Sequence, residues 1–527
     1  MPEDSRIILL VILAAAAFVW LPNLFTIPHW DVDEGYNLNY ARNIADGGVL
    51  WFSIKYAFVP HPPLYLLLLA ALVRLFGESI EVIRVLSVVM NFVVIILLYL
   101  IGRVVDGRRA GLLAAGIFAV YPAAIYWGRM GFSNHLLSLM QLASLYCLVN
   151  FVRSGGRWWI FACAFAGLSP IVEPQGLFIA FALLIYFAAA APRFLARASA
   201  VLLGPTLLFA AVLSAVSGYF VGDVLYQLQR FNLLKPQVLL LLPVIILVLW
   251  KRKILLSYVS DLFVSESRII FGGRELLDNN IIPSALVLAH LLLTATLTRA
   301  LTDEMMLIGG DYFWLGIIGL LFLNRVFLSQ VVLLYFLPSF FAVLVFGRAD
   351  HMLIPLYPFF ALGLAIMLPW LYSFLREKVG VFLAFVVLLC PFALAVYTDW
   401  GAFVLGNMLP GEPVGDLQAV SAYVNNHNPR GGFVVTTTNL VRYLTNATPI
   451  TQAVAYEGYK IEYYRGDYPP DRFVFNCSFR GARYAVLPNS TLGWLSGYAP
   501  GPAGDMERWR MVNASGGYVV LENPTSG

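Results

Sequence analysis

Long apolar runs separated by short polar segments dominate this chain. Of its 527 residues, 60% are hydrophobic and 12% are charged, whereas about 25% of the residues of a soluble domain are charged. A helix of about 20 apolar residues crosses the hydrocarbon core of a bilayer. The composition therefore predicts an α-helical polytopic membrane protein. The small net charge of +4 is spread over short loops, which excludes a basic nucleic-acid surface.

About thirteen runs are long enough to cross, or nearly cross, the bilayer. They lie near residues 6–27, 80–101, 110–127, 134–152, 158–172, 176–191, 198–220, 238–250, 283–299, 312–324, 327–346, 352–374 and 379–398. The apolar segment around 64–76 is not counted. Counting it would place the next arginine cluster on the outer side, so we interpret it as an interfacial or re-entrant helix.

Lysine and arginine clusters in the loops set the orientation, because such residues favour the cytoplasmic side. With this count all the clusters share one side; they lie at 103–109, 153–157, 193–197, 251–253 and 376–378. The amino terminus is then cytoplasmic. Segment 251–282 is assigned to the inside, although it would suit an interfacial helix equally well.

Residues 1–398 are therefore predicted to form the transmembrane domain, with a first outer loop at 28–79. Beyond residue 399 the runs become short, and helix, turn and strand patterns appear at 417–424 and 433–437. Residues 399–527 are predicted to form a soluble α/β domain outside the cytoplasm. Hanging over the outer face, this domain would cover a site there and select its substrate.

Asp31, Asp33 and Glu34 follow directly after the first apolar run. Acidic side chains this close to a bilayer are costly unless they are solvated or functional. The cluster therefore predicts a chemical site that faces water at the membrane surface. The alternative is helix capping, since Asp and Glu favour helix amino termini; for Asp31 a solvated, non-catalytic place is preferred.

The acidic pair, the sequence His61-Pro62-Pro63-Leu64-Tyr65 and the many spans resemble the GT-C glycosyltransferases. Within them the chain is most similar to the protein O-mannosyltransferase and aminoarabinose (lipid A) transferase branch. The resemblance covers residues 6–190 and, more weakly, 348–360. It implies inverting transfer of a sugar from a polyprenyl or dolichyl phosphate to a hydroxyl outside the cytoplasm.

The resemblance also implies roles for single residues. Asp33 matches the catalytic carboxylate that deprotonates the acceptor, and Glu34 is its catalytic neighbour. Arg129 and Arg348 would bind the donor phosphate, because one guanidinium group can donate two parallel hydrogen bonds to two phosphate oxygens. Either arginine could instead be an interfacial anchor.

The remaining predicted site residues would bind substrate. The family places an acid five residues after the second-loop arginine, and here that position is Asn134, which puts a mechanism with two outer-loop acids in doubt. Glu173 would compensate by binding sugar hydroxyls or an amino group, unless it is only an exposed helix end. The predicted substrate-binding set is His61, Tyr65, Asn134, Glu173 and His351.

No cofactor is expected, and a divalent metal, although possible, is not indicated because no ligand spacing supports one. The expected partners are the polyprenyl-phosphate sugar, membrane lipids, and a protein, lipid or glycan acceptor. A flippase or transporter would instead need ionisable residues near the midplane. A non-catalytic scaffold would be insensitive to neutralisation of Asp33.

Overall fold

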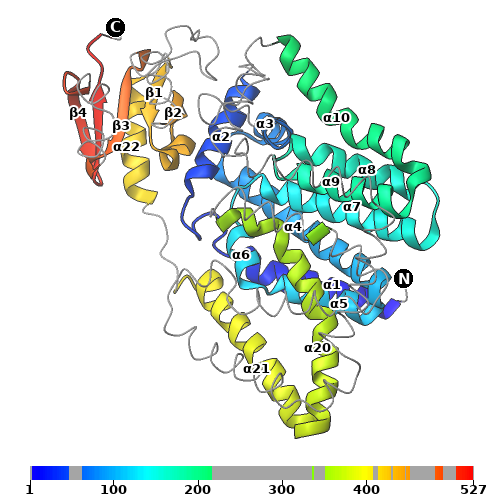
Figure 1. Cartoon of the computed structure of the whole chain (residues 1–527). Helices are drawn as coiled ribbons and strands as arrows, with labels where there is room; N and C mark the ends of the chain where they lie inside the picture. Colours follow the sequence, from blue (N-terminus) through cyan, green and yellow to red (C-terminus); the bar gives the residue numbers. More distant parts are fainter. Residues whose placement is uncertain are drawn as a thin grey trace, which may run out of the picture.

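Helices form the first part of the chain and a mixed sheet forms the last part (Figure 1). The computed structural model describes residues 3–46, 62–216, 335–336, 350–407, 414–428, 431–445, 447–451, 481–490 and 506–525. The predicted runs at 238–250, 283–299 and 312–324, segment 251–282, and the site residues His61 and Arg348 lie outside this part.

The helical body has the apolar helices that the composition predicts. Its elements are α1 (Glu3–Trp20), α2 (Val32–Ala45), α3 (Leu64–Phe76), α4 (Ile80–Asp106), α5 (Arg108–Ala119), α6 (Pro122–Gly128), α7 (Asn134–Ser154), α8 (Trp158–Leu168), η1 (Ser169–Ile171), α9 (Gly176–Ala190), η2 (Pro192–Phe194), α10 (Leu195–Val216), η4 (Asp350–Leu356), α20 (Tyr357–Val379) and α21 (Val381–Asp399). The fold is thus mostly helical, as predicted.

Four helices of the described part are long and apolar enough to cross a membrane, or five if the bent pair α5 and α6 is one span. The four lie at Ile80–Asp106, Asn134–Ser154, Pro192–Val212 and His351–Glu377. Helix α3 has 13 residues, about 20 Å at 1.5 Å per residue, and is too short to cross about 30 Å of hydrocarbon. The total of about thirteen spans stays a prediction.

Helix α4 lies at the centre of the body and packs against α1, α5 and α7. Its approach to α5 is close because glycines face each other: a Cβ on Gly102 would lie 2.7 Å from the Cα of Gly111. A Cβ on Gly111 would lie 2.3 Å from the carbonyl oxygen of Tyr99. The close packing of α4 against α5 therefore requires residues without side chains at Gly102 and Gly111.

Gly111→Ala is expected to destabilise the protein by about 1–3 kcal/mol, because the added methyl group would have to displace backbone. The measurement is the thermal midpoint of the purified protein in detergent. Gly116→Ala is the control on the same helix, since the nearest atom to its Cβ would be Ile12 Cδ1 at 3.9 Å. Equal midpoints for the two variants would contradict the close approach.

The carboxyl-terminal residues form helix α22 and a five-stranded sheet, in the order β2-β1-β3-β5-β4. The elements are α22 (Val414–His427), β1 (Phe433–Thr436), η6 (Thr438–Tyr443), β2 (Thr448–Thr451), β3 (Tyr484–Pro488), β4 (Arg510–Ser515) and β5 (Tyr518–Glu522). Strands β2, β1 and β3 are parallel, and β5 is antiparallel to both β3 and β4. Helix α22 and strand β1 lie where the sequence patterns predict them, whereas β2 and β4 were not predicted.

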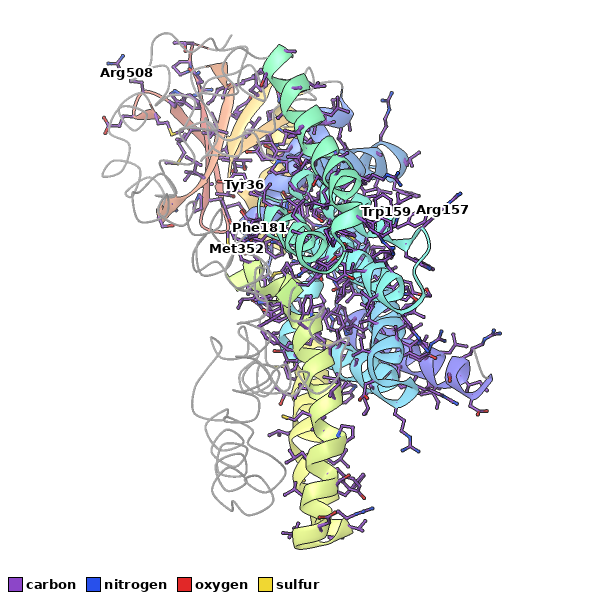
Figure 2. The ribbon with its side chains drawn as sticks, turned by 45° about the vertical axis from the view of Figure 1, so that its right-hand side comes forward. Tyr36, Arg157, Trp159, Phe181, Met352 and Arg508 are labelled. Carbon is purple, nitrogen blue, oxygen red and sulfur yellow. The ribbon has the colours of Figure 1, made fainter. Side chains whose placement is uncertain are left out.

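Apolar residues three or four apart on α22 explain its packing on the sheet. Leu417, Val420 and Val424 are fully buried and form one core with Val434 of β1 and Val486 of β3. On its other side the carboxyl-terminal domain contacts α2 through η6 and β2. In Figure 2, Arg508 marks the carboxyl-terminal domain, and Arg157 lies on the opposite side of the molecule.

Candidate functional site

The acidic cluster is the first turn of helix α2. The Asp31 side chain is the N-cap and accepts a hydrogen bond from the Asp33 N–H at 2.8 Å. The Glu34 carboxylate in turn accepts from the Asp31 N–H at 3.1 Å, which completes a capping box. The capping interpretation is therefore right for Asp31.

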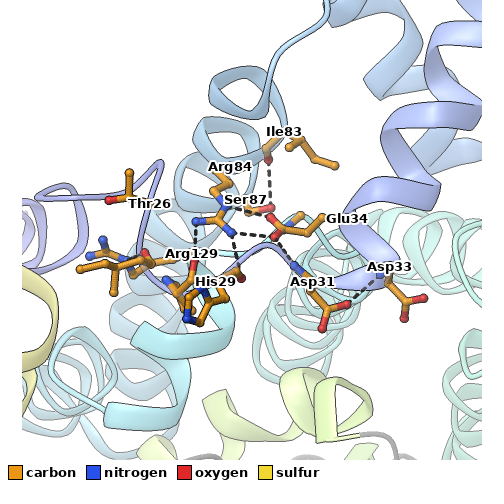
Figure 3. Close-up of polar contacts among 12 residues, drawn as sticks. Thr26, His29, Asp31, Asp33, Glu34, Ile83, Arg84, Ser87 and Arg129 are labelled. Atoms are coloured by element: carbon orange, nitrogen blue, oxygen red, sulfur yellow. Dashed lines mark hydrogen bonds and ion pairs between the residues drawn. The ribbon is translucent and has the colours of Figure 1, made fainter. Parts of the chain in front are cut away.

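Glu34 forms a fully buried ion pair with Arg84 of α4 (Figure 3). Arg84 Nη2 lies 2.7 Å from Glu34 Oε2, and Arg84 Nε lies 2.9 Å from Oε1. The Gly131 N–H also donates to Oε1, at 2.8 Å. The remaining Arg84 N–H groups donate to the carbonyls of Leu24, Pro28 and His29. This network ties the start of α2 to α4 and to the loop between α6 and α7.

This geometry does not fit the predicted catalytic role of Glu34. Both carboxylate oxygens are engaged by hydrogen-bond donors, and the side chain is fully buried. A general base must come within hydrogen-bond reach of the acceptor hydroxyl. Glu34 instead anchors the helix whose first turn carries Asp33.

Arg129 also differs from its prediction. Its guanidinium donates to the carbonyls of Val19, Pro22 and Ile27 and lies over the Phe403 ring at 4.8 Å. Burial, together with the charge of Arg84, lowers the pKa of Arg129 to about 9, so the group is still protonated at pH 7. Because the side chain is fully buried, it stabilises the turn after α1 and does not reach a donor phosphate in this arrangement.

Asp33 remains partly open to solvent, with 18% of its side chain exposed. Its Oδ2 lies 3.6 Å from Nε2 of His351 in η4, a residue more than 300 positions away. The His351 ring stacks on Phe132 at a centroid distance of 4.8 Å and meets the edge of Trp127 at 6.3 Å. The structure thus brings together two predicted site residues, beside an aromatic wall.

The segment between α6 and α7 brings a third predicted residue to this place. Ser133, which directly follows Phe132, donates a hydrogen bond to the Glu173 carboxylate. Glu173 lies in the turn between η1 and α9. Asn134 is buried at the first position of α7. His351 and Glu173 therefore contact the same short segment, from Gly128 to Ser133, and Asp33 lies beside His351.

Tyr65 is fully buried on α3. Burial, with a smaller contribution from the Glu34 charge, raises the pKa of the Tyr65 hydroxyl above its ordinary range. The group is therefore protonated and close to the Glu34 anchor. Its predicted contact with substrate does not fit full burial.

Arg84 is a residue of this site, paired with Glu34, that the sequence interpretation missed. It lies within the predicted apolar run 80–101, where a charged side chain normally pairs with another or with backbone carbonyls. A single arginine within an apolar run is therefore the sequence signal that could have identified it. In the described part of the chain, no three His, Cys, Asp or Glu side chains are grouped to hold a metal ion; metal independence stays an expectation.

Residues 60–219 match the family model described as dolichyl-phosphate-mannose-protein mannosyltransferase. A search of curated protein sequences found no match. Solved structures of two proteins, ArnT and AglB, are among those similar over nearly the whole chain, and both proteins are distant in sequence.

ArnT from Cupriavidus metallidurans in the apo state superposes with a TM-score of 0.60 at 14% identity, covering 98% of this chain and 98% of that one. The same protein bound to undecaprenyl phosphate gives a TM-score of 0.56 at 13% identity, with 98% of each chain covered. The archaeal oligosaccharyltransferase AglB from Archaeoglobus fulgidus, in complex with an inhibitory peptide and a dolichol-phosphate, gives a TM-score of 0.54 at 15% identity. The match covers 99% of this chain and 74% of that one. The predicted resemblance is confirmed: this chain has the fold of the GT-C membrane glycosyltransferases.

Proposed function

We propose that this protein transfers a sugar from a polyprenyl or dolichyl phosphate to an acceptor hydroxyl on the extracytoplasmic side of the membrane. The observation that carries the proposal is the contrast within the acidic pair. Glu34 is locked in a buried network, whereas Asp33 points to a partly open place beside His351. The matched family model and the lipid phosphates named for the similar structures support a polyprenyl-phosphate donor.

In the proposed reaction Asp33 accepts the proton of the acceptor hydroxyl. The hydroxyl oxygen forms a bond to the anomeric carbon while the bond from that carbon to the phosphate oxygen breaks. Attack from the face opposite the leaving group inverts the anomeric configuration. The polyprenyl phosphate leaves with the electron pair, and the proton stays on Asp33 until it passes to water.

The departing phosphate needs cationic or hydrogen-bonding partners. Arg129 does not reach it in this arrangement, so Arg348, three residues before His351 in the sequence, is the proposed phosphate contact. Glu173, which accepts a hydrogen bond from Ser133, is the proposed group for sugar hydroxyls. The acceptor is proposed to be a protein, a lipid or a lipid-linked glycan.

His351 is expected to orient Asp33, and its loss should lower kcat by about tenfold or more. His351→Phe is the sharpest variant, because phenylalanine keeps an aromatic ring to stack on Phe132 and has no ring nitrogen to contact Asp33. Steady-state transfer rates at several donor concentrations measure the effect. If His351→Phe transfers at the native rate, the contact to Asp33 has no part in the reaction.

The proposed function is tested with the purified full chain in lipid vesicles that contain polyprenyl phosphate carrying a radiolabelled sugar. Candidate peptide, lipid and glycan acceptors are added, and labelled product and released polyprenyl phosphate are counted. Transfer predicts equal amounts of both. Movement of intact donor across the bilayer without either product would support the flippase alternative and overturn the proposal.

A further inference from the structure

Helix α2 has a second polar network at its carboxyl-terminal end. Arg42 lies nine residues after Asp33, about 13 Å further along the helix. Its Nη1 lies 2.8 Å from Glu78 Oε2, just before α4. The same guanidinium donates to carbonyls between η6 and β2, those of Leu444 at 2.8 Å, Thr445 at 3.4 Å and Ala447 at 2.7 Å. One side chain thus joins α2, the start of α4 and the carboxyl-terminal domain.

Two further contacts connect the same domain to this helix. The Asn39 amide donates to the Pro449 carbonyl at 2.5 Å. The Arg442 guanidinium lies over the Trp30 ring at 5.1 Å, and Trp30 directly precedes the N-cap. The domain therefore contacts the chain on both sides of Asp33. Figure 1 shows α2 between the helical body and the sheet.

Arginine is suited to this place because its planar fork reaches several acceptors at once. Only 13% of the Arg42 side chain is exposed, so removing it would leave carbonyls without their donors in a poorly solvated interface. A lysine would keep the positive charge but would lack the planar set of N–H donors that the guanidinium group provides. The network is therefore specific to the guanidinium group.

We propose that Arg42 is a positioning residue that holds the carboxyl-terminal domain on α2 and so fixes the orientation of Asp33. This inference rests on the proposed transfer reaction. The Glu34–Arg84 pair holds the amino-terminal end of α2, and Arg42 holds the other end. A helix fixed at both ends keeps its first turn in place against the segment from Gly128 to Ser133.

The test compares Arg42→Ala and Arg42→Lys with the native chain. Arg74→Ala is the matched control, because Arg74 is an exposed arginine in the last turn of α3. The readouts are kcat and KM for the labelled donor, and hydrogen exchange of residues 444–451 and of the first turn of α2. A misplacement of about 1 Å lowers rates by about 10²-fold.

Arg42→Ala is expected to lower kcat by about 10- to 100-fold, leave the donor KM unchanged and speed exchange at 444–451. Arg42→Lys is expected to be intermediate, and Arg74→Ala to behave as native. A native kcat with faster exchange at 444–451 would show that the domain does not position Asp33. Unchanged exchange would show that Arg42 does not hold the domain, and parallel loss of donor binding and thermal stability would show a merely structural role. An absence of transfer by the native chain would instead overturn the proposed function, while exchange would still report the docking.

Glu78 supplies a pH readout for the same network. Burial raises the pKa of Glu78 to about 7, opposed by Arg42 and assisted by the nearby Asp46. Because this value lies above the ordinary 4.5, the stability contributed by neutral Glu78 is fully present below pH 4.5 and is lost as the pH rises through 7. Glu78→Gln, which stays neutral, is expected to show a smaller fall of the thermal midpoint between pH 5 and 8 than the native chain. Identical pH profiles would show that burial does not raise the pKa of Glu78 in this network.

Discussion

Asp33→Asn is expected to lower kcat for sugar transfer by about 10²- to 10⁴-fold, the range that a positioned general base contributes. Asparagine has nearly the same shape and cannot accept the proton at neutral pH. The helix start should survive, because its hydrogen bonds are made by the Asp31 and Glu34 side chains and by the Asp33 N–H. Donor binding and the thermal midpoint are therefore expected to stay close to native values.

Asp31→Asn is the matched control for this variant. It removes the same charge two residues earlier, and asparagine caps helices as well as aspartate does. Transfer rates of the two variants are compared under identical donor concentrations, with donor binding measured separately. Equal rates for native protein and Asp33→Asn would remove Asp33 from the reaction, and equal losses in both variants would point to a general effect of negative charge.

Glu34→Gln is expected to destabilise the protein by about 3–5 kcal/mol, because it leaves the buried Arg84 guanidinium without its counter-charge. The variant also weakens the bonds from the Gly131 and Asp31 N–H groups, which favour a charged acceptor. The effect is measured as a lower thermal midpoint in detergent. Neutralising the two adjacent carboxylates is thus expected to change different properties: Asp33→Asn lowers the transfer rate, and Glu34→Gln lowers the thermal midpoint.

An exposed ion pair serves as the control for that prediction. Arg510 and Glu522 are 2.9 Å apart, with 77% and 30% of their side chains exposed, so Glu522→Gln should cost about 0–1 kcal/mol. The double variant Glu34→Gln/Arg84→Met should be less destabilised than the sum of its single variants, because the two residues share one network. Strict additivity, or a native midpoint for Glu34→Gln, would contradict a coupled buried pair.

Much of the local structure could be predicted without tertiary information. Apolar runs predict helices because backbone groups in hydrocarbon must satisfy their own hydrogen bonds, and α4, α7 and α20 lie where those runs occur. The 3.6-residue and two-residue periodicities similarly predict α22 and strand β1. The acidic cluster is itself a local signal, since capping acts within a few residues.

The roles of Glu34 and Arg129 could not be predicted in this way. Glu34 and Arg84 are 50 positions apart, and Arg129 finds its carbonyl acceptors more than 100 positions earlier. Sequence patterns report the chemistry of a side chain, but not which groups the fold places around it. The adjacent carboxylates Asp33 and Glu34 look equivalent in the sequence and differ only in their surroundings.

The sequence by itself determined the membrane class, the apolar helices of the described part, α22 and β1, because hydropathy and periodicity act over a few residues. It offered a helix start as one of two interpretations of the acidic cluster. Only the tertiary structure decided which carboxylate stays partly open to solvent, which arginines are bonded to backbone carbonyls, and which distant residue faces Asp33. Burial and hydrogen-bond partners decide those properties, and they arise from contacts between segments that are far apart in the chain.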